Sequence, residues 1–218
     1  MPLHRINGRV ILFIHVPKAG GTSVEKALEQ QGGVALYDPG YLFLNRPWSR
    51  CSPQHMHLAL LRRAIRPGFC DAEFAIVREP MERFLSEYRF RRFMRTLPKA
   101  DKFNLDPGEP ADLNPWAEWV LETYSQNPFI LDNHIRPQSA FVGEGVKVFR
   151  LEDGLGRVFD WLSRTTGMML TPSSTRYNET GKRPLALDPG LRRKVLAFYA
   201  ADYEAFGYEE RRSSRVSE

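Results

Sequence analysis

The sequence contains only two cysteines and no long apolar run among its 218 residues. Two cysteines are too few for a disulfide framework, and no Cys/His cluster has the spacing of a zinc site, so we expect both cysteines to be reduced and structural. No stretch of about 18 apolar residues could cross a membrane. The apolar run near the N-terminus leads into Pro17 and Lys18 rather than a small-residue cleavage site, so we interpret it as a core strand and not as a signal peptide. These absences favour a cytoplasmic globular protein.

Charge of one sign is not strongly in excess either. The chain has 31 Lys and Arg against 26 Asp and Glu, a net charge of +5 and a pI near 9.3. This modest excess favours an anionic partner, but nucleic acid, an acidic polysaccharide and a phosphorylated cofactor all fit. The length is most simply that of one domain, which we place at residues 1–210, with a disordered tail over 211–218.

Hydrophobic runs and turn signals alternate along the chain as strand, loop and helix. Continuous β-branched and aromatic runs, typical of strands buried on both faces, predict strands over 9–16, 72–78 and 146–153. Segment 97–115 is rich in Pro, Asp, Gly and Lys, which indicates an excursion from the core, such as a lid. The alternation predicts an α/β fold whose central, mostly parallel sheet is flanked by helices. Helical spacing predicts helices over 22–31, 55–65, 80–94, 115–124, 153–166 and 188–206.

The stretch PKAGGTS directly follows the first predicted strand and opens a predicted helix. A glycine turn at this junction places unpaired backbone N–H groups and the positive end of a helix dipole at one point, which suits an anion. The two hydroxyl side chains add donors and the lysine adds a point charge. Because the lysine precedes the glycines, the order differs from a Walker A loop. The candidate anion-binding residues are Pro17, Lys18, Ala19, Gly20, Gly21, Thr22 and Ser23.

Together with a second motif, this loop resembles a known family. PKAGGTS is similar to the 5′-phosphosulfate loop of sulfotransferases that use 3′-phosphoadenosine 5′-phosphosulfate (PAPS), and VREPMERFLSEY resembles their 3′-phosphate motif. That motif joins an arginine at a strand end to a serine on the following helix, and Arg78 and Ser86 fill these places. Ligands of open α/β sheets collect at such strand ends. The resemblance implies a P-loop nucleoside-kinase-like fold, PAPS as the cofactor and adenosine 3′,5′-bisphosphate as its product.

The C-terminal segment 176–208 is similar to that of the membrane-anchored and bacterial glycan sulfotransferases. In that family a loop before the last helix closes over the nucleotide. The resemblance therefore implies cofactor contacts from Asn178, Thr180, Lys182 and Arg183. Many eukaryotic relatives carry an N-terminal membrane anchor. Because this sequence shows none, we expect a bacterial cytoplasmic enzyme, and a chain from which an anchor had been removed would look the same.

Sulfuryl transfer to a hydroxyl needs a base, and histidine suits this role because its pKa lies near neutral pH. The segment SPQHMHLALLRR places His55 and His57 near the start of a predicted helix. It resembles the histidine motif of heparan sulfate 2-O-sulfotransferases, which puts His55 at the position of the base. A one-step slip of this short alignment would exchange the two residues, so His57 stays a candidate for the base and for a substrate contact.

The segment DNHIRPQSAF resembles a His-x-x-Pro segment of chondroitin-type sulfotransferases. Arg136 and Gln138 are then candidates to contact the acceptor or the sulfate of the cofactor. A buried polar turn would have the same sequence, so both interpretations stay open.

The residues and the resemblance together predict a PAPS-dependent sulfotransferase that acts by in-line attack on a hydroxyl of a glycan or glycolipid. His55 would serve as the base, and Lys18 would stabilise the leaving phosphate. No metal is expected, because no acidic pair is placed to hold one, and no nucleic acid is expected as a partner. Two alternatives remain: a nucleotide kinase, which should carry a Walker lysine, and a non-enzymatic module that binds nucleic acid or acidic glycan through its positive charge.

Overall fold

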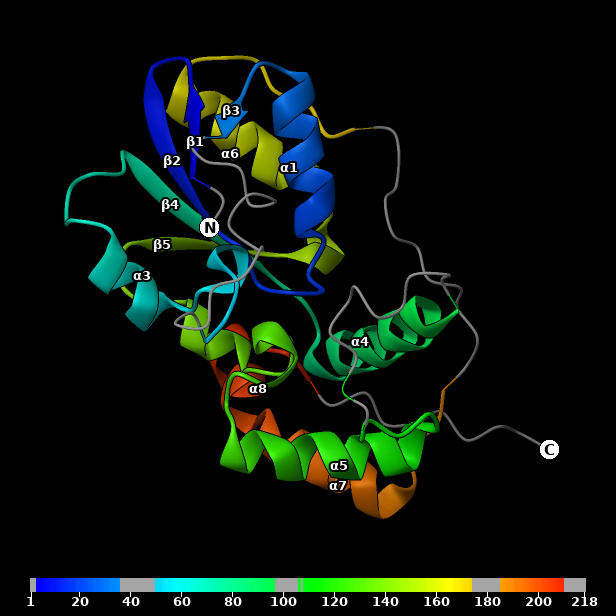
Figure 1. Cartoon of the computed structure of the whole chain (residues 1–218). Helices are drawn as coiled ribbons and strands as arrows, with labels where there is room; N and C mark the ends of the chain where they lie inside the picture. The colour runs from blue at the N-terminus through cyan, green and yellow to red at the C-terminus, as the bar shows by residue number, and fades with distance from the viewer. Residues whose placement is uncertain (1–2, 36–49, 97–105, 107, 174–184, 210–218) are drawn as a thin grey trace.

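A computed structural model describes residues 3–35, 50–96, 106, 108–173 and 185–209 of the chain. Its centre is a five-stranded sheet with strand order β3-β1-β2-β4-β5 (Figure 1). Strands β2, β4 and β5 pair in parallel, whereas β1 pairs antiparallel with both β2 and β3. The bounds are β1 (Leu3–Ile6), β2 (Arg9–Ile14), β3 (Val34–Ala35), β4 (Ala72–Val77) and β5 (Val146–Arg150).

The three parallel strands are the three that the sequence predicts. Phe13 of β2 pairs with Phe74 of β4, and Ala75 of β4 pairs with Val148 of β5. Phe13, Phe74 and Ala75 are at most 1% exposed, as expected for strands covered on both faces. The third strand ends at Arg150, before the predicted end at residue 153.

Strand β1 is absent from the sequence prediction, and it changes the character of the sheet. A two-residue loop of Asn7 and Gly8 joins β1 to β2, with positive φ angles of 46° and 79°. Asn-Gly is a favoured pair in such hairpin loops, because both residues tolerate the left-handed conformation. With β1 and β3 antiparallel, the sheet is mixed rather than mostly parallel.

The helices agree with the predicted ranges apart from two breaks. The predicted helix over 55–65 is interrupted at Met56, whose extended backbone separates η1 from α3. The predicted helix over 188–206 is divided at Tyr199 into α7 and α8. No helix of the described residues is both long enough and apolar enough to cross a membrane. The α-helices are α1 (Gly21–Gln30), α3 (Leu58–Ala64), α4 (Pro80–Arg95), α5 (Leu113–Gln126), α6 (Gly156–Thr166), α7 (Pro189–Phe198) and α8 (Ala200–Phe206), and the 3-10 helices are η1 (Pro53–His55), η3 (Ile130–Asn133), η4 (Gln138–Phe141) and η5 (Leu151–Asp153).

Helices cover both faces of the sheet. Trp161 of α6 packs against Phe74 and Phe149, with ring centroids 5.5 and 5.7 Å apart. Arg62 of α3 binds Glu73, the neighbour of Phe74 in β4, at 2.6 Å. Because neighbouring residues of a strand point to opposite faces, α6 and α3 lie on opposite sides of the sheet.

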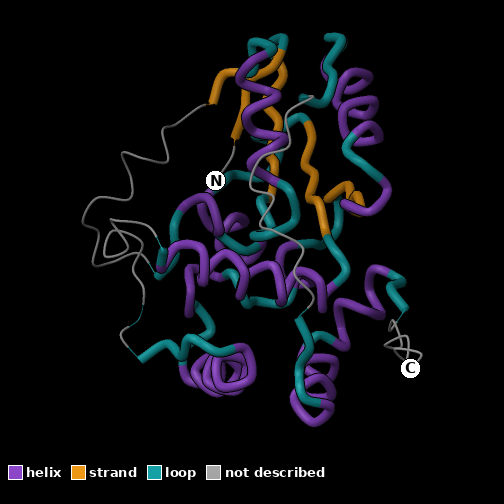
Figure 2. The backbone as a smooth tube through the Cα atoms, turned by 90° about the vertical axis from the view of Figure 1, so that its right-hand side faces the viewer, coloured by secondary structure: helices purple, strands orange, loops and turns teal. Residues whose placement is uncertain are grey.

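A second core forms among α4, α5 and α7, beyond one end of the sheet (Figure 1). Its centre is Trp116 of α5, whose ring lies 5.0 Å from that of Phe84 in α4, and Tyr199 packs beside Phe84. Figure 2 shows the strands gathered in the upper part of the view, with further helices below them. The carboxyl ends of β2 and β4 therefore open between the two cores, where ligands of such sheets collect.

Candidate active site

The loop between β2 and α1 has the geometry of an anion-binding turn. Lys18 and Gly20 have positive φ angles of 67° and 86°, a conformation that costs free energy at a non-glycine residue such as Lys18. Gly20 directly precedes α1, and no side chain of the described residues caps this helix end. The first N–H groups of α1 therefore face the loop with the positive end of the helix dipole, an arrangement that binds phosphate or sulfate.

Gly20 is favoured by its positive φ angle, and Gly21 is required by close packing. A Cβ atom at Gly20 would lie 2.8 Å from a methyl group of Leu151. A Cβ atom at Gly21 would lie within 2.7 Å of three ring atoms of His15, the residue after β2. The first turn of α1 thus rests against an imidazole ring.

Arg78 stands at the end of β4 and approaches the same loop. Its Nη1 lies 3.5 Å from the carbonyl oxygen of Lys18. The side chain of Gln138 binds both polar groups of the Arg78 main chain: its Oε1 accepts from the Arg78 N–H at 2.9 Å, and its Nε2 donates to the Arg78 carbonyl at 2.7 Å. Ser86 lies on α4, which begins two residues after Arg78. The two predicted phosphate motifs therefore meet in space.

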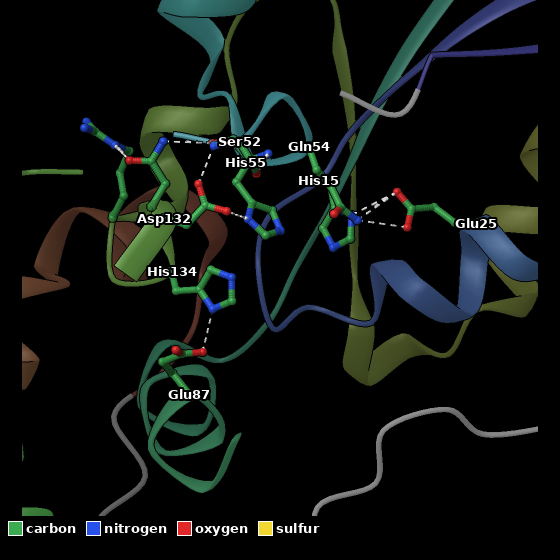
Figure 3. A network of polar contacts seen from close by, with 10 residues as sticks. His15, Glu25, Ser52, Gln54, His55, Glu87, Asp132 and His134 are labelled. Atoms are coloured by element: carbon green, nitrogen blue, oxygen red, sulfur yellow. Dashed lines mark hydrogen bonds and ion pairs between the residues drawn. The ribbon is translucent and has the colours of Figure 1, made fainter. Parts of the chain in front are cut away.

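Three histidines lie in a row beside the loop, each with a carboxylate as its partner (Figure 3). The ring centroids of His15 and His55 are 5.3 Å apart, and those of His55 and His134 are 4.7 Å apart. In both contacts the rings meet edge to face. The three pairs are His15 with Glu25, His55 with Asp132, and His134 with Glu87.

The central pair fixes the orientation of its imidazole. Nδ1 of His55 lies 2.7 Å from Oδ2 of Asp132, and the other oxygen of Asp132 accepts from the main-chain N–H of Ser52 at 2.5 Å. Asn133 donates to the carbonyl oxygen of His55 at 2.8 Å. Because a carboxylate accepts the Nδ1–H, the lone pair of neutral His55 resides on Nε2.

The electrostatics keep His55 neutral and Asp132 charged. Burial lowers the pKa of His55 to about 4, although the hydrogen bond with Asp132 acts in the opposite direction. Burial would raise the pKa of Asp132, but its hydrogen bond with His55 brings it down to about 2. At neutral pH the pair is therefore an uncharged imidazole, ready to accept a proton, beside a carboxylate that can stabilise the resulting cation.

Glu87 interacts electrostatically with His134 and with Lys18 of the loop. It is completely buried, and its Oε2 lies 2.6 Å from Nδ1 of His134. Nζ of Lys18 lies 3.9 Å from the centroid of the Phe90 ring. Burial lowers the pKa of Lys18 while the charge of Glu87 raises it. Burial alone would raise the pKa of Glu87, but His134 and Lys18 together bring it down to about 2, so the carboxylate is ionised.

The site residues described above all lie within the part of the chain that matches a known family. The sulfotransferase family model matches residues 6–209. The chain belongs to the sulfotransferase family. It is an enzyme, and its family indicates transfer of a sulfuryl group to a hydroxyl acceptor. A comparison with curated proteins gives no match.

The two candidate bases of this sulfotransferase occupy different surroundings. His57 precedes α3, its ring lies 5.8 Å from that of Phe129, and its buried Nδ1 has no hydrogen-bond partner among the described residues. His57 is not part of the row of histidines. The geometry favours His55 over His57, and the role of either residue stays a prediction.

Arg136 and Gln138, the two candidates for contacts with the acceptor, both form hydrogen bonds with other residues of the protein. Arg136 donates to Asn133 and to the carbonyl oxygen of Pro128, each at 2.9 Å, and its guanidinium group lies 4.9 Å from the ring of Phe129. Gln138 is completely buried and binds the main chain of Arg78. Both polar atoms of the Gln138 side chain hold Arg78, and a contact of Gln138 or Arg136 with the acceptor stays a prediction.

Four candidates for cofactor contacts lie outside the described residues. These are Asn178, Thr180, Lys182 and Arg183. Their assignment stays an expectation that comes from the family resemblance.

His55, Asp132 and His134 also form a group that could hold a metal ion, with potential ligand atoms within 4.8 Å of one another. The 2.7 Å separation within the His55–Asp132 pair is that of a direct hydrogen bond. The expectation that no metal takes part is untested by this geometry.

Sequence reasoning missed the carboxylate partners of the histidines. Asp132 lies 77 residues from His55 along the chain, and Glu87 lies 47 residues from His134. One signal was available: Asp132 stands two residues before His134, in the segment that already resembled the family. Nothing in the sequence pairs Asp132 with His55 rather than with His134.

Proposed function

We propose that this sulfotransferase uses PAPS as the sulfuryl donor and a hydroxyl of a glycan or glycolipid as the acceptor. We further propose that residues 1–210 form one domain with a P-loop nucleoside-kinase-like fold. One observation carries the proposal: the uncapped loop before α1, Arg78 at the end of β4 and the His55–Asp132 pair lie together at the carboxyl ends of two parallel strands. The glycan acceptor is supported by the likeness to carbohydrate sulfotransferases.

The donor would be held at both of its phosphate groups. The N–H groups of the loop and the hydroxyls of Thr22 and Ser23 would bind the 5′-phosphosulfate, because the end of α1 lacks a side-chain cap. Arg78 and Ser86 would bind the 3′-phosphate, and Gln138 supports Arg78 by fixing its main chain. Such a site would prefer a 3′-phosphorylated nucleotide to ATP.

PAPS supplies an activated sulfuryl group on its 5′-phosphate. In the proposed step, Nε2 of His55 takes the proton of the acceptor hydroxyl while the hydroxyl oxygen attacks sulfur in line. The bond from sulfur to the phosphate oxygen breaks, and the proton stays on His55 as the sulfate ester forms. Asp132 stabilises the imidazolium, and Lys18 stabilises the charge that grows on the leaving phosphate.

The experiment that tests the donor is thermal unfolding with adenosine 3′,5′-bisphosphate, compared with ADP and ATP. A nucleotide at about 100 times its dissociation constant adds roughly 2.7 kcal/mol to the free energy of unfolding. For a chain of this length we expect the melting temperature to rise by about 5–11 °C with the bisphosphate, and by much less with ADP or ATP.

A rise with ATP alone would instead indicate a nucleotide kinase. No rise with any of the three nucleotides would mean that the glycine loop is a structural turn. Once the donor is established, release of adenosine 3′,5′-bisphosphate in the presence of different glycans identifies the acceptor.

A further inference from the structure

One face of α4 carries more positive charge than the predicted 3′-phosphate motif requires. Glu82, Ser86 and Arg89 are spaced four and then three residues apart, so their side chains lie on the same face of the helix. Arg78 approaches this face from the strand that precedes α4. Two guanidinium groups, a carboxylate and the hydroxyl of the buried Ser86 therefore lie along one side of α4.

Neither arginine makes a close ion pair with Glu82. Nη2 of Arg78 lies 3.6 Å and Nη1 of Arg89 lies 4.0 Å from the same oxygen of Glu82. Both separations exceed the length of a normal hydrogen bond. In addition, the buried Nε of Arg89 has no hydrogen-bond partner within the described part of the chain. One carboxylate thus stands between two cations without satisfying either.

The exposure of these side chains shows which partner can leave. The side chain of Glu82 is 44% exposed, whereas those of Arg78 and Arg89 are 25% and 19% exposed. Burial lowers the pKa of Arg78, the carboxylates of Glu82, Glu152 and Glu79 raise it, and the proximity of Arg89 lowers it. The arginine side chains are the less exposed partners, whereas Glu82 can turn into solvent at little cost.

We propose that Arg89 is a second arginine ligand of the 3′-phosphate and that Glu82 occupies the phosphate position until the nucleotide displaces it. This inference rests on the proposed use of PAPS. It assigns a function to two residues of α4 that the arginine–serine motif leaves without one.

The chemistry of a phosphate monoester matches this arrangement. It carries nearly two negative charges and three acceptor oxygens, enough for two arginines and the Ser86 hydroxyl at once. A carboxylate has one charge and two oxygens, so Glu82 satisfies the same donors less completely. The exchange of Glu82 for the phosphate would therefore favour nucleotides that carry a 3′-phosphate.

The test compares the dissociation constants of adenosine 3′,5′-bisphosphate and adenosine 5′-monophosphate by titration calorimetry. The proteins are the wild type, Arg89→Gln, Glu82→Gln and the matched control Arg92→Gln, which removes an exposed arginine of the same helix. Far-UV circular dichroism checks that each variant is folded. Since the nucleotides differ only in the 3′-phosphate, the ratio of their dissociation constants isolates the contribution of that group.

We expect Arg89→Gln to weaken binding of the bisphosphate by about 10- to 100-fold and to change binding of the monophosphate by less than about threefold. Glu82→Gln should strengthen binding of the bisphosphate several-fold, because the competing carboxylate is removed. Arg92→Gln should change neither constant.

Two results would overturn the inference while the proposed function stands. In both, the wild type binds the bisphosphate more tightly than the monophosphate. In the first, Arg89→Gln leaves this preference unchanged. In the second, Glu82→Gln reduces it. If the wild type shows no preference for the bisphosphate, the proposed use of PAPS fails, and the assignment of Arg89 fails with it.

Discussion

At the scale of single residues, the proposed reaction depends on Nε2 of His55, the nitrogen that does not contact Asp132 and that would accept the proton. Its basicity reflects two opposing effects, since burial lowers the pKa and the hydrogen bond with Asp132 raises it. The histidine could be predicted from its motif, whereas the aspartate could not. Residues 131–133, which place Asp132 beside His55, have a left-handed backbone conformation. No sequence pattern predicts this conformation.

We expect Asp132→Asn to lower kcat by about 10²–10⁴-fold with little change in nucleotide affinity, because the imidazolium loses its stabilising charge. Wild-type His55 is neutral above its pKa of about 4, so activity that depends on it should persist well below pH 6.5 as the pH falls. Removal of the carboxylate lowers that pKa, and the acidic limb of the pH–rate profile should move to lower pH. Measurements of kcat from about pH 3 to pH 8 in wild type, Asp132→Asn and the exposed control Asp160→Asn check both points.

Normal turnover in Asp132→Asn would remove the pair from the mechanism. A wild-type acidic limb near pH 6.5 would indicate that a less buried group is the base.

At the scale of elements, the junction from β2 to α1 is the part that the sequence predicted best. A strand, a glycine turn and a helix could be placed within a few residues because each has its own local signal. The break at Met56 was missed, since the apolar spacing runs through it without a glycine and with no proline after Pro53. The interruption before α3 goes with tertiary contacts of η1, in which Gln54 and His55 both contact His15.

Gly21→Ala tests whether the helix start needs its close contact with His15. The added methyl group would overlap the imidazole ring, so we expect a loss of about 1–3 kcal/mol in the free energy of unfolding and weaker nucleotide binding. The control Gly190→Ala lies in α7 with nothing within 4 Å of the new Cβ, and it should be neutral or stabilising by up to about 1 kcal/mol. Urea unfolding and nucleotide titration measure both effects. If Gly21→Ala matches Gly190→Ala in both, the close contact has no role.

At the scale of the whole molecule, the sequence indicated an α/β class but not how the two cores join. The sheet core follows from continuous apolar strands, and amphipathic spacing predicts α4, α5 and α7 one by one. Their assembly depends on a charged residue that a sequence pattern would place in solvent. Arg83 is 1% exposed, with Nε donating to the carbonyl oxygen of Pro17 at 2.9 Å and Nη2 donating to that of His134 at 2.7 Å. It connects the loop between β2 and α1 to the histidine row and the second core.

Arg83→Met keeps an apolar stem of similar length but removes both donors. The two carbonyl groups lose their partner, which costs about 1–3 kcal/mol for each group that stays buried, so we expect a total loss of about 2–6 kcal/mol in the free energy of unfolding. Urea unfolding followed by circular dichroism measures the loss against Arg63→Met, an exposed control on α3 that should change stability by less than about 0.5 kcal/mol. Equal stability of the two variants would show that the cores hold together without Arg83. A loss confined to Arg83→Met, with weaker nucleotide binding, would mean that the residue joining the cores also sets the position of the loop that is proposed to hold the donor.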